Sequence, residues 1–187
     1  MAGVGQLTLR LVASDELTAA QVARLHELMQ DAFAGDEHGG FTEEDWQHAL
    51  GGTHFLLESD GAIVCHASVV TRELHVAGVP LKTAYVEAVA TDPGLQGQGL
   101  GTQVMRAVGD FIDAGDWQIA ALGTGSQAFY ERLGWRIWRG PSFVRTKSGD
   151  VATPDEDGYI MVRLTPRSPA LRPDAPISCE VRPGDVW

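Results

Sequence analysis

The feature that most constrains this chain is a glycine-rich turn between an apolar stretch and an amphipathic helix. Residues 89–102 read VATDPGLQGQGLGT, and apolar residues then recur at helical spacing to about Ala114. Glycines let a backbone approach a ligand closely, and a helix N-terminus presents unpaired N–H groups at the positive end of its dipole. The stretch therefore predicts a strand, an anion-binding loop and a helix, in a chain of the α/β class.

Several phosphate-containing cofactors compete for such a loop. A nucleoside triphosphate loop ends in Gly-Lys-Ser/Thr, which is missing here. A dinucleotide fold needs Gly-x-Gly-x-x-Gly in a first βαβ unit, whereas this chain places Gly97, Gly99 and Gly101 in alternation and in mid-chain. A loop for the diphosphate of coenzyme A is the third candidate, and the alternative interpretation is a turn that only caps the helix.

Hydrophobic periodicity and turn residues predict the remaining elements. A two-residue hairpin turn is expected at Asp60-Gly61, and a turn is expected near Ala77-Gly78. Thr42 is the expected N-cap of a short helix that stops at Gly51-Gly52, with Asp45 completing a capping box. The other predicted helices span 14–33, 99–114 and 126–133, and the predicted strands span 6–12, 54–58, 62–74, 83–91, 118–122, 134–138, 158–164 and 177–181. We expect one domain over residues 1–187.

The charge balance limits the partners of the chain. It carries 14 basic and 25 acidic residues, a net charge of −11, which argues against nucleic acid and is compatible with a cationic substrate. The chain shows no membrane-spanning run, no leader peptide and no metal-ligand spacing, so we expect a cytoplasmic protein without a metal. Cys65 and Cys179 lie far apart and are expected to be reduced.

A second motif narrows the family. Residues 129–135 read FYERLGW and follow the loop Gln96–Gly101 at the spacing seen in the GNAT acetyltransferase superfamily, whose Gln/Arg-x-x-Gly-x-Gly/Ala signature the loop resembles. The resemblance implies the GNAT fold, a mixed central sheet with an antiparallel N-terminal half flanked by helices, and acetyl-CoA as cofactor. The cofactor-binding residues that it implies are Val89, Ala90 and Thr91 for the pantetheine arm, and Gln96, Gly97, Gln98, Gly99, Leu100, Gly101 and Thr102 for the diphosphate.

Segments over nearly the whole chain resemble the aminoglycoside 2′-N-acetyltransferases, among them residues 32–36, 41–46, 85–90, 153–158 and the terminal Gly-Asp-Val-Trp. The resemblance implies acetylation of a polycationic aminoglycoside, antibiotic resistance by its inactivation, and a homodimer. The implied substrate residues are Asp36, Glu87, Ala88, Asp155, Glu156, Asp157, Asp185 and the carboxylate of Trp187, with segment 140–187 completing the substrate site. The sequence departs from the family at Glu156, where Asp is expected, and at Gly123-Thr124-Gly125, where serines are expected. Thr124 or Ser126 is the candidate to supply the missing hydroxyl.

The reaction needs a base, because an amine is mostly protonated near neutral pH. Glu87 is the candidate, on one strand face with Tyr85 and Val89 under strict alternation, and either takes the proton or only anchors the substrate. Tyr130 is the candidate proton donor to the leaving thiolate. A backbone N–H of the Val89 strand is expected to polarise the carbonyl oxygen.

Three alternatives stay open. His54 and His66 are other possible bases, although each is expected to pack or to make a structural hydrogen bond. The acceptor is otherwise another amine, such as a polyamine, an arylamine, or a protein N-terminus or lysine. The chain is otherwise a non-catalytic acyl-CoA-binding module.

Overall fold

The structure is a computed structural model and describes residues 5–35 and 40–187. Its residues fall into two compact units. Unit 1 comprises Met1–Val70 and Val86–Asp110, and unit 2 comprises Thr71–Tyr85 and Phe111–Trp187. Strands β3 (Ala62–Val76) and β4 (Val79–Thr91) and helix α3 (Leu100–Ala114) contribute residues to both units. No helix among the described residues is long and apolar enough to cross a membrane.

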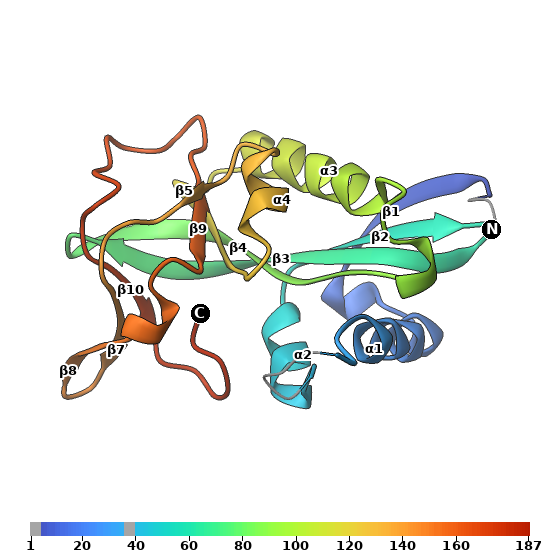
Figure 1. Cartoon of the computed structure of the whole chain (residues 1–187), viewed down its shortest axis with the longest axis horizontal. Helices are drawn as coiled ribbons and strands as arrows, with labels where there is room; N and C mark the ends of the chain where they lie inside the picture. Colours follow the sequence, from blue (N-terminus) through green and yellow to red (C-terminus); the bar gives the residue numbers. More distant parts are fainter. Residues whose placement is uncertain (1–4, 36–39) are drawn as a thin grey trace. The chain divides into compact units, whose positions relative to one another are not determined.

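Unit 1 is built on antiparallel strands. Strand β1 (Leu7–Ala13) pairs with β2 (Thr53–Ser59), and β2 pairs with the first part of β3. Helices α1 (Ala19–Ala32) and α2 (Glu43–Ala49) lie on one side of these strands and the first residues of α3 on the other (Figure 1). The antiparallel N-terminal half of a mixed sheet, expected from the resemblance, is confirmed.

The β2–β3 hairpin contains the expected tight turn and a bulge. Asp60 and Gly61 both have positive φ, 49° and 85°, which is the type I′ geometry favoured in two-residue hairpins. Leu57 pairs with Cys65 but Glu58 pairs with Ile63, so β3 carries one extra residue, Val64.

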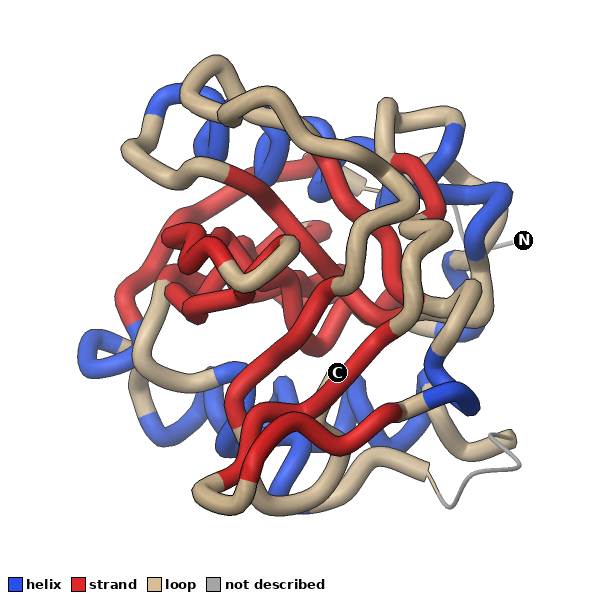
Figure 2. The backbone as a smooth tube through the Cα atoms, turned by 90° about the vertical axis from the view of Figure 1, so that its left-hand side faces the viewer, coloured by secondary structure: helices blue, strands red, loops and turns tan. Residues whose placement is uncertain are grey.

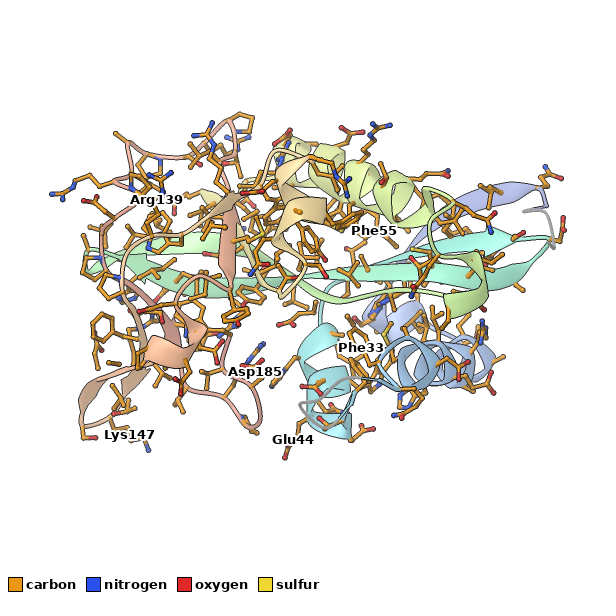
Figure 3. The ribbon with its side chains drawn as sticks, in the orientation of Figure 1. Phe33, Glu44, Phe55, Arg139, Lys147 and Asp185 are labelled. Carbon is orange, nitrogen blue, oxygen red and sulfur yellow. The ribbon has the colours of Figure 1, made fainter. Side chains whose placement is uncertain are left out.

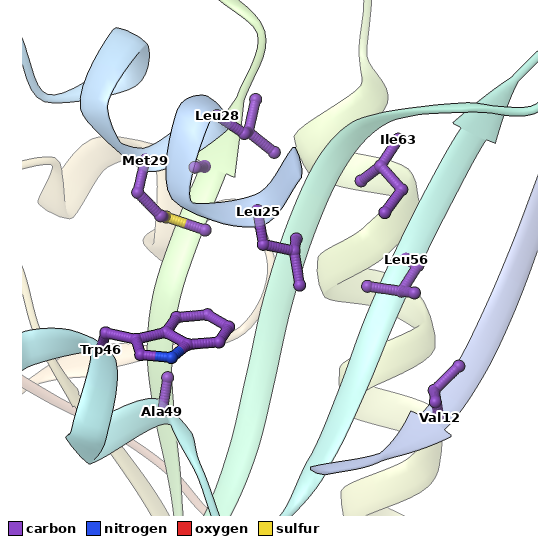
Figure 4. Close-up of a cluster of buried hydrophobic side chains, with 9 residues drawn as sticks. Val12, Leu25, Leu28, Met29, Trp46, Ala49, Leu56 and Ile63 are labelled. Carbon is purple, nitrogen blue, oxygen red and sulfur yellow. The ribbon is translucent and has the colours of Figure 1, made fainter. Parts of the chain in front are cut away.

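Apolar side chains from both helices meet the strands in one cluster (Figure 4). Burial of such side chains is the main force that packs α1 and α2 onto the strands. The buried members are Val12, Leu25, Leu28, Met29, Trp46, Ala49, Leu56, Ile63 and Ala90.

Local capping decides where the two N-terminal helices begin. The capping box at Thr42 and Asp45 is confirmed, with the Thr42 hydroxyl accepting from the Asp45 N–H. The prediction that the first helix starts at Ser14 is wrong. Residues Ser14–Glu16 form a 3₁₀ turn, and α1 begins after Thr18, which makes its own capping box with Gln21. Ser14 is held outside the helix because its side chain bonds to residues far along the chain.

The regular secondary structure of unit 2 is mainly strand, and all strands are drawn in red in Figure 2. Their order is β6-β9-β5-β4-β3-β10-β7-β8, in which β4–β5 and β10–β7 are parallel pairs and the other pairs with a recorded register are antiparallel. The elements not yet bounded are β5 (Ile119–Gly123), α4 (Gln127–Glu131), β6 (Arg136–Ile137), β7 (Ser142–Thr146), β8 (Gly149–Ala152), a 3₁₀ turn at Pro154–Glu156, β9 (Ile160–Arg163) and β10 (Ile177–Glu180).

Two features of unit 2 differ from the sequence prediction. The hairpin of β7 and β8 was not predicted, because its strands are short and β8 is exposed along its length, so neither shows a hydrophobic period. Helix α4 and strand β6 are shorter than expected, since the chain turns at Gly134, where φ is 87°. The turn at Ala77 and Gly78, with φ of 50° and 79°, is as predicted.

Candidate functional site

Strand β4 carries an unusual backbone geometry next to the candidate base. Ala88 has a φ of 50°, in the left-handed region that non-glycine residues rarely adopt. Glu87, Ala88 and Val89 are all half-buried, whereas Tyr85 is fully buried. The prediction that Glu87 and Val89 share one face by strict alternation does not hold, because the left-handed residue between them interrupts the pleat.

The glycine-rich loop continues directly from β4. Thr91 accepts a hydrogen bond through its carbonyl from the Gln96 side chain, and Asp92 caps the short 3₁₀ turn Pro93–Leu95 by accepting from the Gly94 N–H. Asp92 is itself held by Arg24, whose Nη2 lies 3.2 Å from its carboxylate. These contacts fix the entry to the loop from within unit 1.

The loop presents backbone donors to solvent. Gly97 and Gly99 have φ of 77° and 83°, and a side chain at either position would meet no atom within 4 Å. Glycine is required there by backbone conformation, not by crowding. None of the hydrogen bonds found among the described residues uses the N–H of Gly97, Gln98 or Gly99. Exposed donors at the start of α3 suit the diphosphate of coenzyme A.

A buried chain of hydrogen bonds leads to Ala88. Nδ1 of His66 lies 2.7 Å from the Ala88 carbonyl oxygen, and Nε2 of His66 lies 2.9 Å from Nδ1 of His54. Nε2 of His54 lies 2.8 Å from the Ser14 hydroxyl. Both imidazoles are fully buried.

Burial also decides the charge of these rings. Desolvation lowers the pKa of His54 to about 4. Desolvation together with the neighbouring His54 lowers the pKa of His66 to about 3, despite the opposing effect of the Ala88 hydrogen bond. Both rings are therefore neutral at physiological pH, and their ring nitrogens are occupied by structural hydrogen bonds. These contacts favour the structural role expected for both histidines over a role as general base.

The two thiols are poor nucleophiles. Burial raises the pKa of Cys65, whose Sγ lies 3.1 Å from the Thr91 hydroxyl. Burial likewise raises the pKa of Cys179 to about 11. Because the thiolate is the reactive form, neither residue suits covalent catalysis at neutral pH.

Tyr130 lies in α4 of unit 2 and is buried. Its ring makes edge contacts with Phe129 and Trp135, at centroid distances of 4.8 and 6.2 Å. Its carbonyl accepts the N–H groups of Leu133 and Trp135, which closes the turn after the helix. The FYERLGW motif thus builds a rigid aromatic corner around the candidate proton donor.

The acidic residues of unit 2 differ in their environments. Asp155 is exposed and Glu156 half-buried in the 3₁₀ turn Pro154–Glu156. Asp157 accepts from both the N–H and the hydroxyl of Ser142, at 2.9 and 2.7 Å. Asp157 therefore has a structural role in addition to any role in substrate binding.

The C-terminal residues are anchored rather than frayed. Trp187 is 4% exposed, and its indole N–H donates to the Thr153 hydroxyl at 3.0 Å. Asp185, on the C-terminal loop in Figure 3, accepts from the Trp187 N–H at 3.0 Å. Arg182 donates to the Trp187 carbonyl oxygen at 3.2 Å. The structure thus brings Asp185, Trp187 and the Thr153 side chain together in unit 2.

Three outcomes concern residues of the predicted site. Asp36 lies outside the described residues. In the 123–126 loop the Thr124 hydroxyl accepts from the Ser126 N–H at 2.9 Å, as a turn residue. The sequence did not indicate that Arg72 and Arg182 donate hydrogen bonds to the C-terminal residues Val186 and Trp187. It also did not indicate the hydrogen bonds that connect Ser14 to His54 and His66. Two histidines on strands joined by a predicted hairpin were the available signal for that link.

Comparison with known proteins identifies the family. The chain matches the family described as acetyltransferase (GNAT) domain over residues 14–138. An aminoglycoside 2′-N-acetyltransferase of Mycolicibacterium fortuitum is 38% identical over 184 residues, which covers 96% of this chain and 92% of that protein.

Solved structures share the fold. A GNAT family acetyltransferase from Brucella melitensis, solved in complex with acetyl-CoA, superposes with a TM-score of 0.63 at 15% identity over 92% of this chain and 94% of that chain. A GCN5-related N-acetyltransferase from Kribbella flavida superposes with a TM-score of 0.57 at 23% identity over 72% of this chain, which spans only 34% of that longer chain. The family match covers most of the sequence and the M. fortuitum relative is similar almost from end to end, so the chain belongs to the aminoglycoside 2′-N-acetyltransferase family of GNAT acetyltransferases.

Proposed function

We propose that this protein transfers an acetyl group from acetyl-CoA to the 2′-amino group of an aminoglycoside and thereby inactivates the antibiotic. The observation that carries the proposal is the 38% identity, over 96% of the chain, to an enzyme named for that reaction. The net charge of −11 supports it, because a negative field concentrates a polycationic substrate.

The loop before α3 supports acetyl-CoA as the donor. The backbone N–H groups of Gly97, Gln98 and Gly99 bind the diphosphate, and the strand residues Val89–Thr91 pair with the pantetheine arm. Bound there, the cofactor supplies an activated thioester. The exposed, unbonded loop amides and the positive φ of both glycines fit this role.

The transfer needs three groups of the chain. Glu87 takes a proton from the attacking ammonium group, directly or through a water molecule, so that the nitrogen lone pair is available. The N–H of Val89 polarises the thioester carbonyl oxygen while the N–C bond forms and the C–S bond breaks. Tyr130 gives its phenolic proton to the departing sulfur, and the second proton that the nitrogen loses as the amide forms restores the phenol. Buried thiols with raised pKa values support direct transfer without an acyl-cysteine.

Carboxylates of unit 2 recognise the substrate. Asp155 and Asp185 are exposed and belong to the segment 140–187 that the family resemblance assigns to substrate binding. Carboxylates make charge-assisted hydrogen bonds with ammonium groups, and several of them match the several amines of an aminoglycoside. Glu156 and Asp157 extend this acidic segment, and Trp187 supports it through Thr153.

A matched substrate pair tests the proposal. Kanamycin B carries an amine at the 2′ position and kanamycin A a hydroxyl, and the two are otherwise identical. With acetyl-CoA, we expect thiol release and one added acetyl group for kanamycin B alone, located on the 2′ nitrogen by fragmentation. Equal acetylation of both compounds would place the reaction at another amine. Turnover of a peptide or polyamine without turnover of kanamycin B would reject an aminoglycoside substrate.

A further inference from the structure

We propose that Ser14, His54 and His66 are positioning residues, a hydrogen-bond chain of fixed direction that holds the left-handed backbone at Ala88. Through Ala88 the chain keeps Glu87 and the Val89 N–H in place for acetyl transfer, so this role rests on the function proposed above. All members of the chain lie in unit 1.

The left-handed backbone conformation of Ala88 needs stabilising contacts from other residues. With a φ of 50°, its methyl group crowds the backbone, and an alanine left to itself prefers the extended strand conformation. In that conformation the residues on either side would follow the ordinary alternation of a strand. Such strain persists only where surrounding contacts over-determine it, and it commonly occurs at functional positions.

The main stabilising contact is the hydrogen bond from His66. Its Nδ1 lies 2.7 Å from the Ala88 carbonyl oxygen, and the ring is fully buried. The neighbouring carbonyl, that of Glu87, accepts a longer contact of 3.5 Å from the Ser68 hydroxyl. A short bond to a buried partner restrains the peptide after Ala88 far more strongly than that long one.

The groups at the two ends of this hydrogen-bond chain decide which atom is the donor in each of its bonds. The Ala88 carbonyl only accepts, so Nδ1 of His66 carries a hydrogen, and Nε2 of the neutral ring accepts from Nδ1–H of His54. Nε2 of His54 then accepts from the Ser14 hydroxyl. The Ser14 oxygen in turn accepts from the N–H groups of Gly51 and Gly52, at 2.9 and 3.1 Å.

This arrangement positions the backbone and does not conduct protons. A peptide carbonyl is too weakly basic to receive a proton, so a relay ending at Ala88 has no acceptor. Both rings are neutral and each ring nitrogen makes a hydrogen bond, so the side chains form a continuous hydrogen-bonded connection from Gly51-Gly52 to β4. Breaking any of these hydrogen bonds would leave buried polar atoms without a partner, and the free-energy cost of that keeps the connection intact.

The tautomers are the first test. Side-chain ¹⁵N spectra of the uniformly labelled protein should show His54 and His66 as neutral rings with the hydrogen on Nδ1, the less common tautomer in water. This reading does not depend on any substrate. A hydrogen on Nε2 of either ring would overturn the direction of the chain.

A double-mutant cycle tests the positioning role. His66→Leu removes the donor to Ala88 and should lower kcat by up to about 100-fold, with little change in acetyl-CoA affinity by calorimetry. Ala88→Gly removes the strain of the positive φ, so His66→Leu should lose much less activity in the A88G background. His66→Asn, whose amide nitrogen occupies the place of Nδ1, should be intermediate, and serves if His66→Leu does not fold.

The matched control is His26→Leu. His26 lies in unit 1, and its buried Nε2 has no hydrogen-bond partner among residues 5–35 and 40–187, so this change should leave kcat unaltered. Equal losses from His66→Leu in both backgrounds would reject the positioning role. Backbone chemical shifts of Ala88 report the left-handed conformation in each folded variant. An unchanged Ala88 shift in His66→Leu would show that His66 does not stabilise this conformation. That reading separates failure of this inference from failure of the proposed reaction.

Discussion

The guanidinium carbon of Arg72 lies 4.4 Å from the centre of the Tyr85 ring, and the same guanidinium donates a 2.9 Å hydrogen bond to the Val186 carbonyl. Arg72 also pairs with Glu180 at 2.8 Å. Although burial lowers its pKa, the interactions with Tyr85 and Glu180 leave the pKa above its ordinary value. One buried cation thus joins the β3–β4 hairpin to the C-terminal segment of unit 2.

Removal of this cation should destabilise unit 2. Arg72→Met keeps most of the side-chain volume but removes the hydrogen bonds to Glu180 and Val186, and we expect a loss of about 2–3 kcal/mol in the free energy of unfolding. Chemical denaturation measures it. Arg10→Met is the control, because Arg10 is exposed and its 3.7 Å pair with Glu58 should contribute less than about 0.5 kcal/mol. Equal effects of the two changes would contradict a structural role for Arg72.

The glycine loop predicts a selective binding defect. Gly97→Ala introduces no clash but forces a non-glycine residue into a left-handed conformation at a cost of about 1 kcal/mol, which corresponds to about fivefold in the Kd for acetyl-CoA. Gly125→Ala is the control, since that glycine has equal space and no positive φ. Calorimetry with acetyl-CoA compares them, and an equal Kd for both variants would remove Gly97 from the binding loop.

Tyr130 should act on the chemical step. Tyr130→Phe keeps the aromatic corner with Phe129 and Trp135 but removes the phenolic proton, so kcat should fall by about 100-fold or more while the Kd for acetyl-CoA stays the same. Steady-state kinetics and calorimetry give the two values. Tyr159→Phe, an exposed tyrosine of the same unit, should change neither. Unchanged turnover of Tyr130→Phe would assign proton delivery to another group.

The buried histidines predict a loss of stability in mild acid. The pKa values in the folded state are about 4 for His54 and about 3 for His66, against 6.5 in the unfolded chain. Above pH 6.5 both states are neutral at these rings. As the pH falls from 6.5 towards 4, only the unfolded chain takes up the protons, so each ring lowers the free energy of unfolding by about 1.4 kcal/mol per pH unit. Denaturation at several pH values measures the slope.

Comparison with a variant isolates the histidine contribution from that of the carboxylates. His66→Asn removes one titrating ring and should reduce the slope by about 1.4 kcal/mol per pH unit. A slope equal to that of the parent would mean that His66 is accessible to protons in the folded state.

The acidic segment should separate binding from stability. Asp155→Asn should raise the KM for an aminoglycoside without changing the free energy of unfolding, because Asp155 is exposed. Asp157→Ala should cost about 1–2 kcal/mol of stability, because it leaves the buried Ser142 N–H without its acceptor, although the Ser142 hydroxyl can still donate to the Thr153 carbonyl. Thermal denaturation and steady-state kinetics compare the two variants. A loss of stability in Asp155→Asn together with a raised KM in stable Asp157→Ala would contradict these assignments.

Local rules explain which elements were predictable. The turns at Asp60-Gly61 and Ala77-Gly78, the cap at Thr42 and the glycine loop each depend on residues within a few positions of one another, so their physical causes are visible in the sequence. The family resemblance added the candidate roles of Glu87 and Tyr130, which no local rule reveals.

The sequence by itself thus determined the glycine loop, the order of most elements and the family. Only the tertiary structure decided that Ala88 takes a left-handed backbone, because nothing in an alanine favours it and the donor that stabilises it, His66, lies 22 positions away. The same holds for Ser14, which the helical period placed in α1 and which His54, 40 positions on, holds outside it. Hydrogen bonds between distant residues outweigh local preference there, since a buried polar atom without its partner costs more free energy than an unfavourable backbone conformation or a shorter helix.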